Sequence, residues 1–240
     1  MRSSRLFTPE VLQVGAEVEL GQKAGHYLSR VLRMSSNAEI ILFNGDGQDY
    51  RCVLENLNRD GASARVVECL PGIPDSSLKI TLCQAISRGD RMDYSLQKAT
   101  ELGVTSVRLL LSERVEVKLG GSRLEKRLAH WQGVIQSASE QCGRSTLPKL
   151  YPPVVLHEWP KSNYQRLVLD ARADLPMRSL KLADKVEIAV GPEGGFSDAE
   201  IGLIVRSGAQ NIRLGPRVLR TETAGPAAIA VLQSMGGDFS

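Results

Sequence analysis

The sequence predicts an α/β fold with a mainly parallel sheet, preceded by a smaller β-rich module. Beyond residue 77, apolar runs of strand length alternate with helical patterns, which is typical of a parallel sheet covered by helices. Residues 1–70 instead carry short strand-like runs separated by turn signals. The segment Pro71–Ser77 lies between the two patterns and is rich in proline and small polar residues. We therefore expect one domain at 1–72 and a second at 73–240.

The N-terminal module is expected to form a compact β-barrel. Its strand-like runs are Ala38–Phe43, Asp49–Glu55 and Ala62–Leu70, and Gly45-Asp46-Gly47 predicts a turn between the first two. The pattern of Gly25–Leu32 indicates a short helix.

Strands and helices are expected to alternate along the second module. The predicted order is a strand at Leu78–Gln84, a helix at Asp90–Leu102, a strand at Ser106–Leu111, a helix at Leu124–Glu140, and strands near Leu167 and Val186. Ser122, followed three residues later by Glu125, predicts the N-cap of the second helix. Apolar residues recur at helical spacing from Leu124 to Ala138, and this stripe favours core packing or a dimer contact over a cofactor site.

Two strand-like runs near the C-terminus each end in Gly-Pro. Val186–Val190 leads into the loop Gly191–Phe196, and Asn211–Leu214 leads into a second small-residue loop. Ser197 and Glu200 have the spacing of a capping box, so a helix is expected to begin at Ser197. Gly-Pro can simply turn a chain, but two such loops in tandem favour a ligand site at the carboxyl ends of the strands.

The composition of these loops bears on the kind of ligand. Glycines allow backbone N–H groups to approach a ligand closely. Neither loop is followed by the Gly-Lys-Ser/Thr of a Walker motif, and neither has the Gly-x-Gly-x-x-Gly spacing of a dinucleotide fold. The sequence therefore disfavours a phosphate cradle and favours a ligand held by backbone amides and carbonyls.

The last helix is expected to run from Glu222 or Thr223 to about Gln233. It contains Pro226, and proline is best tolerated in a first turn, where its missing N–H has no partner. We therefore expect the helix proper to begin close to Gly225.

Overall composition indicates a globular protein. The chain has 240 residues, 42% of them hydrophobic, and can bury a sizeable core. No apolar run approaches the ~20 residues that span a bilayer, so we expect a cytoplasmic protein without membrane contact. The four cysteines form no Cys-x-x-Cys pair, which argues against a metal site or a disulfide framework. The net charge of +3 is too small to predict nucleic-acid binding by itself.

Several motifs closely resemble a known family, the bacterial 16S ribosomal RNA uracil-N3 methyltransferases of the SPOUT superfamily. The most specific are Gly191-Pro192-Glu193-Gly194-Gly195-Phe196 and the stretch from Leu214 to Ala224, LGPRVLRTETA. Further blocks that resemble the family are Arg5-Leu6-Phe7, His26 through Val31-Leu32-Arg33, Gln97 to Gly103, Ser112-Glu113-Arg114 and Glu140 to Arg144. One departure is Asn37-Ala38-Glu39, where the family usually carries Gly-Asp, and it affects only the expected local turn.

The resemblance implies a fold, a cofactor and partners. It implies an N-terminal PUA-like RNA-binding β-barrel and a C-terminal SPOUT α/β domain with a trefoil knot. It further implies S-adenosylmethionine as methyl donor, a homodimer, and methylation of N3 of a decoding-region uridine in 16S ribosomal RNA of the small subunit. Knots are rare among protein chains, so this is a specific expectation.

The resemblance also assigns the donor site to three strand ends. The residues expected to bind the cofactor are Leu169, Asp170, Val190, Gly191, Pro192, Glu193, Gly194, Gly195, Leu214, Gly215, Val218, Leu219, Arg220, Thr223 and Ala224. Asp170 follows a strand, and terminating that strand is an equally good explanation of its presence.

Arg220 is the expected catalytic residue. Methylation at N3 requires an unpaired or flipped uridine and loss of the imide proton. A planar, permanently charged guanidinium suits the negative charge that develops on the uracil carbonyls. The alternatives for Arg220 are a phosphate contact or a salt bridge, for instance with Glu222. Glu193 either hydrogen-bonds within its own loop or accepts the proton.

Candidate RNA-binding residues lie in both domains: Arg5, Arg30, Arg33, Lys98, Glu140 and Arg144. Arg30 and Arg33 share one helix face, where surface solvation explains them equally well. Glu140 and Arg144 have the spacing of an ordinary helical ion pair, and the same alternative applies to Lys98 with Glu101.

Two other functions compete with the methyltransferase. A non-catalytic RNA-binding protein is disfavoured by the intact glycines and Arg220, and a nucleotide-phosphate enzyme by the missing Lys-Ser/Thr.

Overall fold

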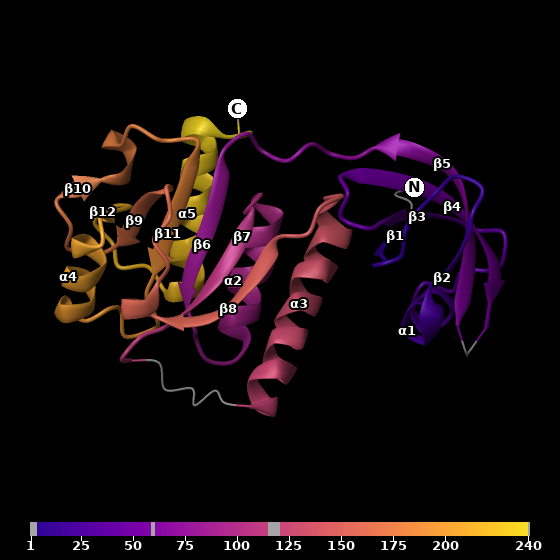
Figure 1. Cartoon of the computed structure of the whole chain (residues 1–240), viewed down its shortest axis with the longest axis horizontal. Coiled ribbons are helices and arrows are strands. Elements are labelled where there is room, and N and C mark those ends of the chain that lie inside the picture. Colours follow the sequence, from indigo (N-terminus) through magenta and orange to yellow (C-terminus); the bar gives the residue numbers. More distant parts are fainter. Residues whose placement is uncertain (1–3, 59–60, 115–120, 240) are drawn as a thin grey trace. The chain divides into compact units, whose positions relative to one another are not determined.

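The computed structural model describes residues 4–58, 61–114 and 121–239 (Figure 1). The chain forms two compact units, one of Met1–Asp75 with Ser139–Leu147 and one of Ser76–Ala138 with Pro148–Ser240. The first unit extends slightly beyond the sequence boundary at residue 72. It also takes in 139–147, which the sequence analysis assigned to the second domain.

The first unit contains a mixed five-stranded sheet. Its strands, in spatial order, are β1 (Ser4–Phe7), β3 (Glu39–Phe43), β4 (Gln48–Leu57), β5 (Ala62–Pro71) and β2 (Glu17–Glu19). β1 is parallel to β3, and the other neighbours are antiparallel. The three longer strands confirm the prediction, whereas β1 and β2 are too short to give a clear sequence pattern.

The predicted helix of this unit begins earlier and has two parts. It consists of α1 (Gly21–His26), which continues into a π-helical turn, η1 (Tyr27–Val31). A Cβ atom on Gly25 would lie 2.6 Å from the carbonyl carbon of Gly61. Glycine therefore lets the helix backbone pack directly against the turn between β4 and β5.

Segment 139–147 joins the first unit through partly buried ion pairs and hydrogen bonds. The guanidinium of Arg5 pairs with the carboxylate of Asp49 and donates a hydrogen bond to the carbonyl of Arg144 at 3.1 Å. The side chain of Arg144 pairs with Asp75 at 2.9 Å. These contacts join residues far apart in the sequence, which is why local patterns did not reveal them.

The second unit is built on a seven-stranded sheet in which every pairing is parallel. Its spatial order is β10 (Leu175–Pro176), β12 (Gln210–Arg213), β9 (Gln165–Leu169), β11 (Lys185–Val190), β6 (Lys79–Ala85), β7 (Ser106–Leu111) and β8 (Lys149–Val155). The prediction of a mainly parallel sheet is confirmed. The edge strands β8 and β10 were not predicted; β8 contains two adjacent prolines, which are tolerated at an edge.

Alternate residues of the central strands supply two separate cores. Leu82, Leu109 and Ile188 face one side, which is covered by α2 (Asp90–Glu101), α3 (Ser122–Cys142) and α5 (Thr221–Gly236). Cys83 and Ala189 face the other side, which is covered by α4 (Asp198–Arg206) and the 3-10 turn η2 (Leu156–Glu158). A second 3-10 turn, η3 (Met177–Ser179), follows β10. Figure 1 shows α2 and α5 behind the central strands.

The apolar stripe of α3 is part of this core. Trp131, Ile135 and Ala138 are almost fully buried within the unit, so the stripe does not by itself call for a second subunit. Ser122 is the first residue of α3 and not its cap. The carbonyl of Gly121 accepts the first helical hydrogen bonds instead, and Gly121 adopts a positive φ of 53°.

The starts of α4 and α5 are set in different ways. The predicted capping box of α4 is confirmed, because Ser197 and Glu200 each accept the other's backbone N–H. The prediction that α5 begins near Gly225 is wrong, since α5 begins at Thr221 and Pro226 lies inside it. Side-chain hydrogen bonds fix the position of Thr221, the first residue of the helix, as described below.

Candidate functional site

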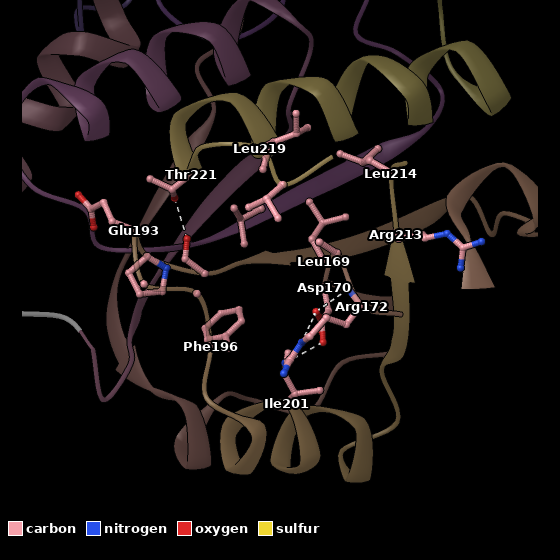
Figure 2. A pocket seen from close by; sticks show the side chains of 18 of the residues that line it. Leu169, Asp170, Arg172, Glu193, Phe196, Ile201, Arg213, Leu214, Leu219 and Thr221 are labelled. Carbon is pink, nitrogen blue, oxygen red and sulfur yellow. Dashed lines mark hydrogen bonds and ion pairs between the residues drawn. The ribbon is translucent and has the colours of Figure 1, made fainter. Parts of the chain in front are cut away.

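A cavity of about 430 Å³ opens at the carboxyl ends of β9, β11 and β12 (Figure 2). Its volume lies within the ~300–1,000 Å³ that is usual for small-molecule sites. Figure 2 shows Leu214 and Leu219 on the α5 side and Phe196 and Ile201 on the α4 side. The walls are therefore largely apolar, with a small number of polar groups between them.

Most of the residues expected at the donor site do line this cavity. They are Leu169, Asp170, Val190, Gly191, Pro192, Glu193, Gly194, Gly195, Leu214, Gly215, Val218, Leu219 and Ala224. Arg220 and Thr223 are absent from the described lining. Ten further residues line the cavity without having been expected there: Arg114, Ala171, Arg172, Phe196, Asp198, Ile201, Ile212, Arg213, Arg217 and Thr221. Arg217 and Thr221 belong to a recognised motif, whereas no sequence signal pointed to Arg172.

The loop Gly191–Phe196 closes tightly on itself. A Cβ on Gly191 would lie 2.9 Å from the backbone nitrogen of Phe196, closer than side-chain carbons are found. Gly195 has a φ of 67° and donates its N–H to the carbonyl of Pro192 at 2.8 Å. Phe196 is buried in the core beneath α4 and anchors the end of the loop. Glycine at the first and fifth positions is thus required by the backbone itself.

The first residue of α5 is tied to this loop. The hydroxyl of Thr221 donates to the carbonyl of Gly191 at 2.7 Å and accepts from the amide of Gln84 at 3.0 Å. Gln84 is fully buried on β6, and a Cβ on Gly225 would lie 3.4 Å from its side-chain oxygen. These contacts hold the two Gly-Pro loops against one another and define the floor of the cavity. The trefoil knot expected from the resemblance stays a prediction.

The end of β7 supports a third side of the site. The backbone N–H of Glu113 donates to the buried carboxylate of Glu200 at 2.8 Å, and Ser197 donates its hydroxyl to Glu113 at 3.0 Å. The guanidinium of Arg114 donates to the carbonyl of Gly194. The capping box of α4 therefore also fixes the position of the glycine loop.

Arg172 joins the loop after β9 to the first turn of α4. Its guanidinium pairs with Asp170 at 3.1 Å and with Asp198 at 2.8 Å (Figure 2 draws the first pair). Partial burial alone raises the pKa of the Asp170 carboxyl, but the hydrogen bonds from Arg172 outweigh it and the pKa lies below its ordinary value. Asp170 is therefore a carboxylate at neutral pH. It lines the cavity as well as ending its strand.

Glu193 is held as an anion by groups outside its loop. Its carboxylate accepts from the N–H of Arg88 at 3.0 Å and from the guanidinium of Arg91 at 2.9 Å. Partial burial alone raises the pKa of Glu193, but these donors outweigh it and the pKa falls below its ordinary value. A carboxylate with a lowered pKa is a weak base. These two partners lie outside the loop, so the structural role of Glu193 differs from the expected hydrogen bond within the loop, and its lowered pKa disfavours proton abstraction.

Arg220 is exposed and lies between two residues that line the cavity, Leu219 and Thr221. Its side chain is 80% exposed, and its guanidinium is 4.0 Å from the carboxylate of Glu222. Three residues earlier in the same loop, Arg217 does line the cavity. The catalytic role of Arg220 stays a prediction, and the alternatives of a phosphate contact or a loose ion pair are also compatible with its exposure.

Some of the expected RNA-binding side chains are used inside the first unit. Arg5 and Arg144 form the partly buried ion pairs described above, and Glu140 accepts the N–H of Phe7 at 3.0 Å. Their geometry gives these three residues a structural role. Lys98 pairs with Glu101 at 2.9 Å, the ordinary helical pair that the sequence analysis considered.

Arg30 and Arg33 are exposed on α1–η1 and its end, together with Lys23 and Tyr27. In the part of the chain that the structure describes, none of the three cations is paired with a carboxylate. By contrast, the exposed barrel residue Arg51 pairs with Glu68 at 2.7 Å. Among the described residues, this surface therefore offers positive charge that no carboxylate neutralises.

Comparison with known proteins agrees with this architecture. A family model for an RNA methyltransferase domain matches residues 74–233, and one for an RNA methyltransferase PUA domain matches residues 20–67. The chain belongs to this RNA methyltransferase family. The ribosomal RNA small subunit methyltransferase E of Buchnera aphidicola subsp. Schizaphis graminum is 32% identical to this chain, over 100% of this chain and 99% of the relative.

Solved structures of similar proteins share the whole fold. A methyltransferase from Legionella pneumophila, in complex with bound S-adenosylmethionine, is 38% identical with a TM-score of 0.95. A ribosomal RNA small subunit methyltransferase E from Neisseria gonorrhoeae, bound to S-adenosylmethionine, is 38% identical with a TM-score of 0.93. Each comparison covers 100% of both chains.

The described residues offer neither a metal cluster nor a membrane-spanning helix. Within residues 4–58, 61–114 and 121–239, no cluster of three or more His, Cys, Asp or Glu side chains is arranged to hold a metal ion. None of the helices in those ranges is long and apolar enough to cross a membrane.

Proposed function

We propose that this RNA methyltransferase binds S-adenosylmethionine in the cavity at the ends of β9, β11 and β12 and methylates N3 of a uridine in 16S ribosomal RNA. The observation that carries the proposal is that both Gly-Pro loops, whose sequence resembles the uracil-N3 family, meet in one cavity of small-molecule size. Similar structures from Legionella pneumophila and Neisseria gonorrhoeae contain S-adenosylmethionine, and the relative in Buchnera is named for small-subunit ribosomal RNA.

The residues present fit such a donor. Apolar side chains of Leu214, Leu219 and Ile201 suit a flat purine ring, and Asp170 supplies an ionised acceptor for hydroxyl donors. Gly215 lines the cavity, and a Cβ built on it would meet no protein atom within 4 Å, so the second loop leaves open space for a ligand.

When bound, S-adenosylmethionine supplies a methyl group on a positively charged sulfur, and the S–C bond breaks as the N3–C bond forms, leaving its electron pair on sulfur. The protein's own contribution is positional. The ties from Thr221 to Gly191 and from Arg114 to Gly194 hold both loops in place before a ligand arrives. Loops that are already in place lower the entropy cost of bringing the methyl group and the RNA base together, and this lowers the barrier to methyl transfer.

The RNA is proposed to contact the first unit at Lys23, Arg30 and Arg33. Their charges are unpaired in the described residues, and Tyr27, which is 42% exposed beside them, offers a ring for base stacking. Arg220 is proposed to contact a phosphate, because it is exposed at the edge of the donor site. A homodimer, a small-subunit substrate and a cytoplasmic location remain proposals that rest on the family resemblance.

A direct test measures binding and then product. Calorimetry with S-adenosylmethionine, S-adenosylhomocysteine and ATP should show binding of the first two only. Methylation of 16S RNA and of small subunits should then give a single site at which reverse transcription stops, since a methyl on N3 blocks Watson–Crick pairing. Nuclease digestion and mass spectrometry should identify 3-methyluridine. A methyl group on C5 or on a ribose hydroxyl would refute the N3 assignment.

A further inference from the structure

Four arginines line the described part of the donor cavity: Arg114, Arg172, Arg213 and Arg217. The proposed methyl donor carries a positive charge, which a guanidinium beside it would repel. Each arginine of the cavity therefore needs an anionic or hydrogen-bond-accepting partner, either in the protein or in the substrate. The partners of these four side chains therefore indicate which of them is available to a substrate.

Three of the four guanidinium groups are already engaged by the protein. Arg114 donates to the carbonyl of Gly194, and Arg172 pairs with two carboxylates. Arg213 donates to the carbonyl of Ala173 at 2.6 Å, and Figure 2 shows its side chain directed away from the cavity. These three arginines hold loops in place.

Arg217 differs from the other three. It is exposed, and in the described part of the chain it has no hydrogen-bond, ion-pair or ring partner. Its neighbour Val218 also lines the cavity and is 85% exposed, so the tip of this loop presents a free cation beside an uncovered apolar surface. Such a tip is suited to a substrate that is both flat and anionic when it reacts.

We infer that Arg217 is the catalytic residue that stabilises the uracil anion during methylation, in place of Arg220. This inference rests on the proposed N3 methylation. The N3 proton leaves to water or hydroxide, and the charge spreads onto the two carbonyl oxygens that flank N3. The planar guanidinium of Arg217 donates to one of these oxygens, which lowers the cost of forming the anion.

The test compares Arg217→Ala and Arg217→Lys with Arg206→Ala. Arg206 is an exposed arginine in the last turn of α4 and lies outside the described cavity lining. Arg217→Ala should lower the single-turnover rate at saturating donor and RNA by ~100-fold or more, the scale of one lost preorganised contact. Arg217→Lys should recover part of the rate, and Arg206→Ala should match the parent. Donor affinity should stay within about twofold for all three, a difference of less than about 0.5 kcal/mol.

Two further measurements separate a catalytic role from a structural one. The rate of Arg217→Ala should keep rising with pH after the parent has levelled off, because the imide is harder to ionise. A substrate with 5-fluorouridine at the target position should restore much of the lost rate, since fluorine lowers the pKa of N3. Without any donor, ultraviolet titration of the bound fluorinated RNA should show a lower N3 pKa with the parent protein than with Arg217→Ala.

Three results would overturn the inference. Weaker donor binding with an unchanged saturated rate would make Arg217 a donor contact. A weaker RNA affinity with a salt slope reduced by ~1 and an unchanged pH profile would make it a phosphate contact, the pattern expected for Arg220→Ala. A parent-like rate for Arg217→Ala would remove it from the site. If the parent protein itself forms no 3-methyluridine, the proposed function fails first.

Discussion

The first glycine of the loop after β11 gives the sharpest test of the donor site. In Gly191→Ala, the added Cβ would lie 2.9 Å from the nitrogen of Phe196 and 3.1 Å from the carbonyl carbon of Gly195. Non-bonded heavy atoms prefer ~3.5–4.0 Å, so the loop must open by roughly half an ångström. The obstacle is backbone and cannot rotate away. We expect a stability loss of ~1–3 kcal/mol, the usual cost of overpacking.

The loop movement should also disturb donor binding. Gly191 accepts the hydrogen bond of Thr221, so opening the loop displaces both walls of the cavity. We expect the Kd for S-adenosylmethionine to rise tenfold or more, which is about 1.4 kcal/mol. Calorimetry measures the affinity, and urea unfolding measures the stability at the same temperature. Far-UV circular dichroism should stay unchanged.

Two glycines serve as controls because a Cβ on either meets no protein atom within 4 Å. Gly133→Ala, on the exposed side of α3, should leave donor affinity unchanged and raise stability by ~0.5–1 kcal/mol. Gly215→Ala adds a methyl group to the cavity wall without protein strain, so any loss of affinity reports the ligand alone. Gly194→Val is less clean, because its Cβ would meet the flexible side chain of Arg114 at 3.2 Å. Parent-like affinity in Gly191→Ala would refute the reasoning.

Three further variants have defined expected outcomes. In Glu193→Gln, the neutral-to-alkaline rate profile should match that of the parent, because Glu193 has a lowered pKa and is a poor base; a loss of ~100-fold would make it the base. The charge of Glu193 stabilises the folded state above the ordinary pKa of 4.5, and this stabilisation is lost as the pH falls through the lowered pKa. The free energy of unfolding of Glu193→Gln should therefore fall less steeply than that of the parent as the pH is lowered. Arg166→Ala leaves the buried Glu187 without its 2.9 Å partner and should cost ~3–5 kcal/mol in urea unfolding, most of it recovered when Glu187 is also replaced by leucine. Arg5→Ala should destabilise the first unit by breaking the pair with Asp49, while the salt slope of RNA binding stays that of the parent; a reduced slope would return Arg5 to the RNA surface.

Local patterns in the sequence were sufficient for most of the second unit. The alternation of apolar runs and helical stripes predicted the central strands and α2 to α4, because burial on both faces of a parallel sheet leaves continuous apolar runs. The capping box of Ser197 and Glu200 could also be predicted from the sequence, because the two residues lie only three positions apart. Two glycines marked the loop after β11. The backbone at Gly191 leaves no room for a side chain, and Gly195 adopts a positive φ.

Contacts between distant segments were decided only by the tertiary structure. Arg5 and Arg144 carry the charge expected of RNA-binding residues, and only the fold shows that Asp49 and Asp75 neutralise them. Arg217 and Arg220 stand in one motif, three residues apart. The sequence alone favoured Arg220, whereas in the structure Arg217 is the one of the two that lines the cavity. Periodicity reports the local path of the backbone, but the neighbours of a charged side chain depend on which loops meet, and that is determined by the packing of the whole chain.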